Sequence, residues 1–349
     1  MAVKKKADDS AYRDLKKAIA DRNVGNLYIL HGEEVYLRDY YLGKMKAALL
    51  TGGLDDFNYH TIAAKDFSMY RLRELVDSMP MMSERTMVVV SDYDIYKGDK
   101  EEMLDILSDL PDYICLVFIY DVIGYKADNR AKLAKLVKEK GHVVDFARQN
   151  QGDLTDWIAR RFRALGHDIS TEDARYLIFL CGDLMTGLIS EIGKVGAYAK
   201  DRRVTRRDID AVATPQLDAV VFQLTDAIAA GNFDEAFSVL GDLLHMQEAP
   251  IKLLAILGKQ LRQLYTARLA IENNRGKDFI MELWGMRNSY PAEKLMRSAR
   301  RFSLDWCRRA VIRCQETDLA MKSTGTDGAE LLTGLLLELA QRKADRNLQ

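Results

Sequence analysis

Residues 113–120 read Tyr-Ile-Cys-Leu-Val-Phe-Ile-Tyr, and this run decides the fold. It has no alternation of polar and apolar residues, which indicates a strand buried on both of its faces. Four more short, β-rich apolar runs lie on either side of it, at residues 27–30, 58–62, 86–91 and 142–146. Helical patterns separate these runs, at residues 35–50, 68–79, 100–107 and 128–138. Strands that alternate with helices predict a parallel sheet with helices on its faces.

The character of the sequence changes after residues 149–152, which read Gln-Asn-Gln-Gly. From Asp153 onward the apolar residues follow a helical period, and no further strand is predicted. Thr171 with Asp173, and Thr205 with Asp208, are typical of helix N-termini. Pro215 is followed by six predicted longer helices, with breaks near residues 231–232, 248–250, 273–276, 289–291 and 325–328. We therefore predict three domains, at residues 1–150, 151–213 and 214–349.

Composition excludes several classes of protein. The 349 residues are 48% hydrophobic and 30% charged, with a formal charge of −1, which excludes a globally basic nucleic-acid binder. The four cysteines form no CxxC pair, and no two of the five histidines lie within one helical turn, so we expect no metal and no cofactor. No uncharged run approaches the roughly 18 residues of a membrane span, and Met1–Lys6 leads into charged sequence. We expect a cytoplasmic protein in a reducing compartment that does not bind membranes.

The first predicted strand and the turn after it carry a degenerate phosphate loop. In a P-loop protein this position holds several glycines and a Lys-Ser/Thr pair that bind phosphate and magnesium. Here Gly32 stands alone, and Glu33 and Glu34 lie where a polyanion would have to bind. Asp92 and Asp94 follow the third strand but are interpreted as turn residues. The architecture fits a nucleotide-binding domain, whereas the residues argue against ATP hydrolysis.

Other catalytic arrangements are weaker still. No Gly-x-Ser-x-Gly turn is present, which argues against a serine hydrolase. His31 and His60 are interpreted as partly buried structural residues. No catalytic residue is therefore predicted.

A methionine pair interrupts the pattern before the strand at residues 86–91. The preceding helix carries an apolar stripe at spacing i, i+3, i+4, i+7, formed by Leu72, Leu75, Val76 and Met79. Pro80 is expected to end this helix, which leaves Met81 and Met82 on a connector. Two consecutive side chains do not easily point into one core, so at least one is expected to project outward and to fit the hydrophobic pocket of a partner. The alternative is that the connector folds back onto the edge of the sheet.

A cationic stretch lies between residues 287 and 313. Its basic residues are Arg287, Lys294, Arg297, Arg300, Arg301, Arg308, Arg309 and Arg313, against only Glu293 and Asp305. Such a patch can contact phosphate, acidic faces of sister subunits, or only solvent. We select Arg297, Arg300, Arg301, Arg308 and Arg309 as candidates for contact with DNA or with a subunit.

Several stretches, in order from about residue 10 to 340, together resemble one family, the delta subunit of the bacterial DNA polymerase III clamp loader. The resemblance rests on residues 27–37, 78–85, 87–90, 126–130, 132–133, 141–146, 182–184, 191–194, 221–227 and 318–325. It implies a RecA-like AAA+ domain without ATPase activity, a small helical lid and a helical collar, giving an α/β plus all-α chain. Pro80, Met81 and Met82 would bind the clamp.

The resemblance also implies partners and a role. A delta subunit assembles with the gamma/tau ATPase subunits and the delta-prime subunit, and it binds and opens the sliding clamp for loading onto primed DNA. It is a non-catalytic part of a DNA-directed DNA polymerase holoenzyme, a nucleotidyltransferase. Two alternatives stay open: an AAA+ or P-loop NTPase with an atypical phosphate site, and a helical scaffold that binds DNA through residues 287–313.

Overall fold

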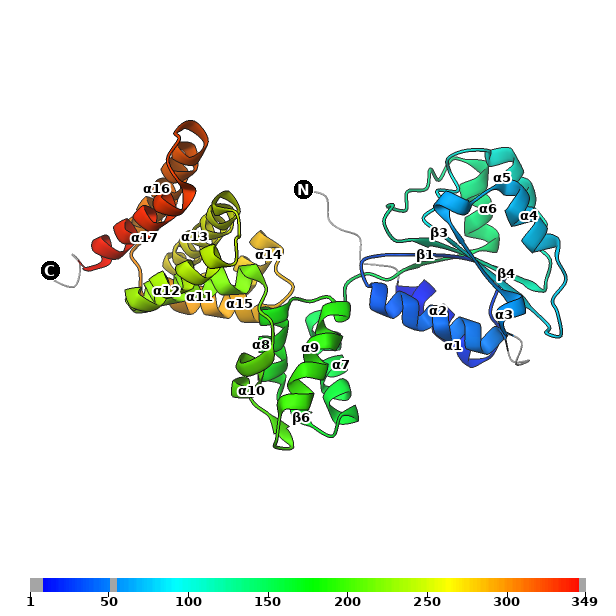
Figure 1. Ribbon diagram of the computed structural model, residues 1–349, viewed down its shortest axis with the longest axis horizontal. Helices are drawn as coiled ribbons and strands as arrows, with labels where there is room; N and C mark the ends of the chain where they lie inside the picture. Colours follow the sequence, from blue (N-terminus) through cyan, green and yellow to red (C-terminus); the bar gives the residue numbers. More distant parts are fainter. Residues whose placement is uncertain (1–8, 51–54, 345–349) are drawn as a thin grey trace. The chain divides into compact units, whose positions relative to one another are not determined.

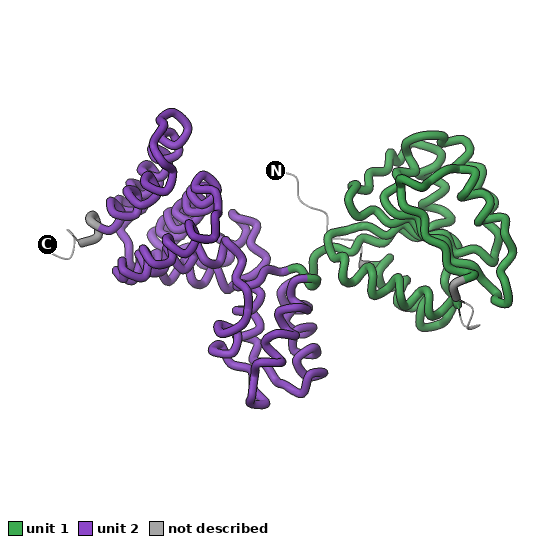
Figure 2. Tube along the Cα trace, in the orientation of Figure 1, with its two compact units in different colours: residues 1–149, 184–186 green, residues 150–183, 187–349 purple. Residues whose placement is uncertain are grey.

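The computed structural model describes residues 9–50 and 55–344 of the chain. Met1–Lys6, on which the expectation of no signal sequence rests, lies outside these residues. The chain divides into two compact units, which Figure 2 colours separately. Unit 1 comprises residues 1–149 and 184–186, and unit 2 comprises residues 150–183 and 187–349. The division of unit 2 into two domains stays a prediction.

Unit 1 contains a five-stranded sheet in the order β2-β3-β4-β1-β5, and every pair of neighbours is parallel. The strands are β1 (Leu27–His31), β2 (Tyr59–Ala63), β3 (Thr86–Ser91), β4 (Ile114–Tyr120) and β5 (His142–Asp145). The apolar run at residues 113–120 contains the central strand β4, and all seven residues of this strand are buried. The predicted parallel sheet is therefore confirmed.

Helices cover both faces of this sheet (Figure 1). They are α1 (Asp9–Ala20), α2 (Val35–Leu49), α3 (Asp55–Asn58), α4 (Met69–Asp77), α5 (Lys100–Ser108) and α6 (Lys132–Lys140), with a 3₁₀ turn at Ala64–Asp66. Helices α1 and α2 lie on one face, and α4, α5 and α6 lie on the other. Two of these helices begin at N-cap residues. Ser68 and Asp99 accept hydrogen bonds from backbone N–H groups in the first turns of α4 and α5.

The remaining helices belong almost wholly to unit 2. They are α7 (Gln151–Ala164), α8 (Thr171–Cys181), α9 (Met185–Tyr198), α10 (Arg206–Val212), α11 (Leu217–Ala230), α12 (Phe233–His245), α13 (Pro250–Glu272), α14 (Lys277–Trp284), α15 (Ser289–Ala299), α16 (Leu304–Ser323) and α17 (Gly328–Ala344). The N-terminus of α10 is confirmed as a capping box, in which Thr205 N donates to Asp208 at 2.8 Å. Helix α8 begins as predicted, but its capping side chain is Ser170.

Two predictions for unit 2 are wrong. A short parallel pair is present, β6 (Asp168–Ile169) with β7 (Arg203–Val204), because pairs of two residues are too short to leave a period in the sequence. The predicted helix after residue 291 is in fact two helices, α15 and α16. Ser303 caps the second by accepting from Trp306 N at 3.0 Å.

Unit 2 has its own core, which includes Phe222, Leu257, Leu261, Trp306 and Leu336, all buried. The predicted fold class is confirmed in its layout, since a parallel sheet with helices on its faces is followed by a helical region. Among the described residues, no single helix is long and apolar enough to cross a membrane, although the bent pair α8 and α9 passes on length and composition.

Candidate functional site

The connector between α4 and β3 presents three methionines to solvent. The exposed fractions of Met79, Met81 and Met82 are 82%, 55% and 81%. The prediction that Met79 lies on the core face of the preceding helix is wrong, because α4 ends at Asp77. Both Met81 and Met82 project outward, where at least one was expected to do so. We call residues 79–85 the methionine turn.

A buried asparagine holds the methionine turn against the sheet. Asn58, the last residue of α3, is 1% exposed. Its Nδ2 donates to Met81 O at 2.8 Å, and its Oδ1 accepts from Met81 N at 2.8 Å. The next residue, Met82, has a φ of +52°, in the left-handed region that non-glycine residues rarely adopt. The turn therefore has a defined shape although its side chains are exposed.

Arg85 fixes the other end of the methionine turn. Its guanidinium donates to the carbonyl oxygens of Gly25 at 3.2 Å and Ile114 at 3.0 Å, and also to that of Val24. These carbonyls lie just before β1 and at the start of β4, at the amino edge of the sheet. A charged donor shared among several carbonyls ties the turn to the edge from which β3 starts.

The predicted phosphate loop after β1 is closed against the chain that follows β5. Phe146 N donates to His31 O at 2.7 Å, and Glu34 N donates to Phe146 O at 2.8 Å. Gly32 has a φ of +120°, and a Cβ placed there would lie 2.5 Å from the carbonyl carbon and oxygen of Phe146. The backbone N–H of Glu34, at a position that would face the phosphate in a P-loop, therefore serves an internal contact here.

Both carboxylates of this loop have protein partners. Glu33 forms an ion pair with Arg148. Glu34 is fully buried, and its carboxylate accepts from Met185 N at 3.3 Å, within unit 1. Neither side chain is arranged to bind a phosphate, since carboxylates and phosphates repel each other.

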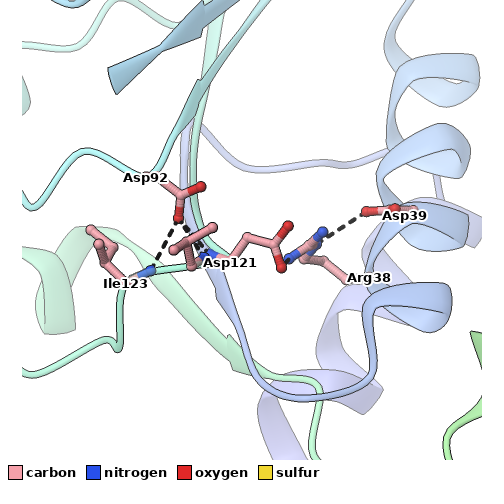
Figure 3. A network of polar contacts seen from close by, with 6 residues as sticks. Arg38, Asp39, Asp92, Asp121 and Ile123 are labelled. Carbon is pink, nitrogen blue, oxygen red and sulfur yellow. Dashed lines mark hydrogen bonds and ion pairs between the residues drawn. The ribbon is translucent and has the colours of Figure 1, made fainter. Parts of the chain in front are cut away.

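The acidic residues after β3 and β4 form a polar network at the carboxyl edge of the sheet (Figure 3). Asp92 accepts from Asp121 N at 2.9 Å, Val122 N at 2.8 Å and Ile123 N at 3.3 Å. Arg38, from α2, forms ion pairs with Asp121 at 3.0 Å and Asp39 at 3.1 Å. Burial disfavours the charge of Arg38, but these contacts outweigh it and raise its pKa. Asp92 thus has the structural role that the sequence indicated.

Aromatic side chains lie beside this network. His31 stacks on Tyr125 with ring centroids 4.9 Å apart, and Tyr96 Oη lies 3.0 Å from Tyr125 Oη. Burial lowers the pKa of His31, and the nearby carboxylate of Asp145 opposes this only in part. Burial also raises the pKa of Tyr96. These groups are neutral at physiological pH and fit a packing role.

Some basic residues of the cationic stretch at residues 287–313 form ion pairs within the protein. Lys294 pairs with Asp226, Arg309 with Asp305, and Arg313 with both Glu316 and Glu338. Arg297, Arg300, Arg301 and Arg308 are exposed, and none of them has an ion pair within the described part of the chain. These four side chains remain available to an acidic or phosphate-bearing partner.

Metal and thiol chemistry find no support in the described residues. No group of three metal-ligating side chains is present among them. All four cysteines are buried, and burial raises the pKa of Cys115 to about 12. These thiols are protonated at neutral pH and are poor nucleophiles.

Sequence reasoning missed the residues that shape the methionine turn. It placed Asn58 at the start of a strand and Arg85 in the connector, with no further role for either. Their partners lie 23 and 29 or more residues away in the chain, and no local pattern encodes such contacts. Taken singly, Asn58 and Arg85 match no sequence motif that would have predicted these contacts.

Comparison with protein families gives two matches. The profile described as "DNA polymerase III, delta subunit" matches residues 28–147, and that of "DNA polymerase III delta subunit, C-terminal domain" matches residues 218–339. The first match contains both the methionine turn and the closed phosphate loop. The second contains the exposed arginines.

Individual relatives match over nearly the whole chain. DNA polymerase III subunit delta of Bacillus subtilis is 25% identical, over 94% of this chain and 97% of the relative. Probable DNA polymerase III subunit delta of Aquifex aeolicus is 22% identical, over 92% of this chain and 93% of the relative. The solved structure of the Bacillus subtilis DNA clamp loader delta protein matches with a TM-score of 0.56 and 22% identity, over 94% of this chain and 99% of that one.

Proposed function

Because the chain belongs to the DNA polymerase III delta subunit family, we propose that it is a clamp-loader subunit that binds and opens the sliding clamp. The observation that carries this proposal is the methionine turn. It combines two exposed, adaptable apolar side chains with a backbone held by the sheet. An apolar anchor on an ordered backbone is what a hydrophobic pocket on a partner requires.

The energy available from this anchor contributes to clamp binding but does not account for it alone. Burying two methionine side chains fully contributes at most ~3–6 kcal/mol from apolar area. Association and side-chain ordering subtract from this sum. The turn would therefore act as the centre of a larger interface, and we expect other residues of unit 1 to surround it.

Clamp opening would follow from differential binding. A protein opens a closed ring only if it binds the open or strained interface more tightly than the closed one. We propose that Pro80, Met81 and Met82 bind the clamp pocket and make this distinction. ATP binding by the gamma/tau subunits would expose the turn within the complex, and hydrolysis would withdraw it. Delta-prime and primed DNA complete the assembly, which would act in the cytoplasm at the replication fork.

We further propose that this subunit has no ATPase activity of its own. The closed phosphate loop supports this, since Glu34 N and Gly32 face Phe146. A ligand at one hundred times its Kd stabilises a protein by about 2.7 kcal/mol. We expect no rise in the melting temperature of the isolated chain with millimolar ATP and magnesium. A rise that grows with ATP concentration would instead favour the alternative of an NTPase with an atypical phosphate site.

The free arginines of unit 2 are proposed to contact DNA phosphates within the assembled complex. Replacing Arg297 and Arg301 by alanine is expected to reduce the salt dependence of DNA binding, by about 0.9 in the slope of log K against log[salt] for each phosphate that is no longer neutralised. The measurement is a salt titration of primed-DNA binding by the assembled complex. Arg202→Ala is the control, because Arg202 is exposed and paired with Asp168. An unchanged slope would favour contact with a sister subunit.

The experiment that tests the function is a calorimetric titration of the full chain with the sliding clamp of the same organism, without nucleotide. We expect sub-micromolar binding. If no binding is seen, the titration is repeated with the ATPase subunits and ATP present. Failure there as well would refute the proposed function.

A further inference from the structure

Asn58 is a buried polar side chain that contacts both backbone groups of one exposed residue. Its amide donates to Met81 O and accepts from Met81 N, each at 2.8 Å. A side-chain amide that pairs with both groups fixes the position and the direction of that residue. We propose that Asn58 is a positioning residue, which holds the methionine turn in the form that binds the clamp. This inference rests on the proposed function.

The position of Asn58 in the fold gives it a rigid support. It ends α3 and is followed directly by β2, which pairs with β3 in the register Tyr59 with Met87. Asn58 therefore lies at the amino edge of the sheet, beside the start of the strand that the methionine turn leads into. The sheet fixes the asparagine, and the asparagine fixes Met81.

The conformation of Met82 shows why such support is required. A φ of +52° costs an L-residue free energy relative to the right-handed region, so the neighbouring contacts must enforce it. Asn58 acts on the residue before Met82. On the other side, Ser83 Oγ donates to Arg85 O at 3.2 Å, and Arg85 is anchored to the sheet. Without Asn58 the turn would be held at one end only.

A turn that is ordered before binding avoids an entropic cost at the interface. Asn58→Ala removes both hydrogen bonds and leaves both methionine side chains in place. We expect this variant to bind the clamp roughly 5- to 30-fold more weakly than the wild-type chain. Asn58→Asp, which preserves the volume, is expected to bind more weakly too. A carboxylate accepts hydrogen bonds but does not donate them. The aspartate would therefore place an oxygen against the Met81 carbonyl oxygen, to which the asparagine amide donates.

Two measurements separate positioning from general damage to the fold. Hydrogen exchange should show that the Met81 amide loses protection in Asn58→Ala, while the amides of β1 keep theirs. A double-mutant cycle compares the loss of binding free energy caused by Asn58→Ala in the wild-type chain and in the Met82→Ala variant. We expect the loss in the Met82→Ala variant to be less than half of that in the wild-type chain, because Asn58 acts through the turn. If Asn58→Ala does not fold, Asn58→Asp takes its place in both measurements.

Three outcomes would contradict the inference. Affinity within twofold of wild type would mean that the order of the turn does not affect binding. Equal losses of affinity in both backgrounds would mean that Asn58 acts elsewhere. An unchanged Met81 amide would mean that Asn58 does not order the turn. If the wild-type chain fails to bind the clamp both alone and with the ATPase subunits and ATP, the proposed function fails, and the exchange of the Met81 amide still decides whether Asn58 orders the turn.

Discussion

Replacing Met81 and Met82 together by alanine is expected to weaken clamp binding by about 2–4 kcal/mol, roughly 30- to 900-fold in Kd. The physical reason is that each methionine loses most of its apolar surface when a partner's pocket covers it. Both side chains are available for this, with exposed fractions of 55% and 81%. Met82→Ala alone is expected to cost about 1–3 kcal/mol. Calorimetric titration of each variant with the clamp gives these values directly.

The stability of the free chain should not change in this experiment. Both side chains are exposed, and substitutions at such positions usually alter the free energy of unfolding by less than about 0.5 kcal/mol. A matched control is Val122→Ala. Val122 is 87% exposed and follows β4, at the carboxyl edge of the sheet, whereas the methionine turn lies at the amino edge. If the double methionine variant binds within twofold of wild type, or if Val122→Ala weakens binding equally, the contact with the clamp lies elsewhere.

The sheet of unit 1 was predictable because burial on both faces leaves a strong pattern. All seven residues of β4 are apolar or aromatic, and any other environment would expose them. Element ends were less predictable because they depend on single contacts. Helix α4 stops at Asp77, two residues before the end of its apolar stripe, which moves Met79 from the core to the surface. Periodicity alone does not contain that information.

The sequence predicted which side chains form the candidate site, but not which residues hold them in place. Pro80 and two consecutive methionines on a connector indicated at least one outward side chain, and the absence of a lysine from the phosphate loop argued against catalysis. What orders the turn depends on Asn58, 23 residues earlier, and on carbonyl groups next to β1 and β4. Such contacts follow from the order of the strands in space, which the strand pattern alone leaves undetermined.

Gly32→Ala is expected to destabilise unit 1 by about 2–6 kcal/mol. A φ of +120° strains any residue with a Cβ, at about 1–3 kcal/mol, and overpacking adds about 1–3 kcal/mol. The new methyl group would lie 2.5 Å from the carbonyl carbon and oxygen of Phe146, and a backbone carbonyl cannot rotate away. This clash is relieved only if the loop after β1 moves away from the segment that follows β5. Such a movement breaks the 2.8 Å hydrogen bond from Glu34 N to Phe146 O. Hydrogen exchange of the β1 amides in the full chain measures the loss within unit 1.

Gly43→Ala is the matched control, because Gly43 lies in α2 and nothing lies within 4 Å of the place that an alanine methyl group would occupy. Alanine there should stabilise the helix by about 0.5–1 kcal/mol. Equal protection of β1 in the wild type and Gly32→Ala would contradict the close packing at Phe146. In a phosphate loop, glycine lets the backbone approach a phosphate. Here the same freedom lets the loop approach the carbonyl that follows β5. Gly32 thus serves a packing contact, so its replacement should lower stability rather than nucleotide binding.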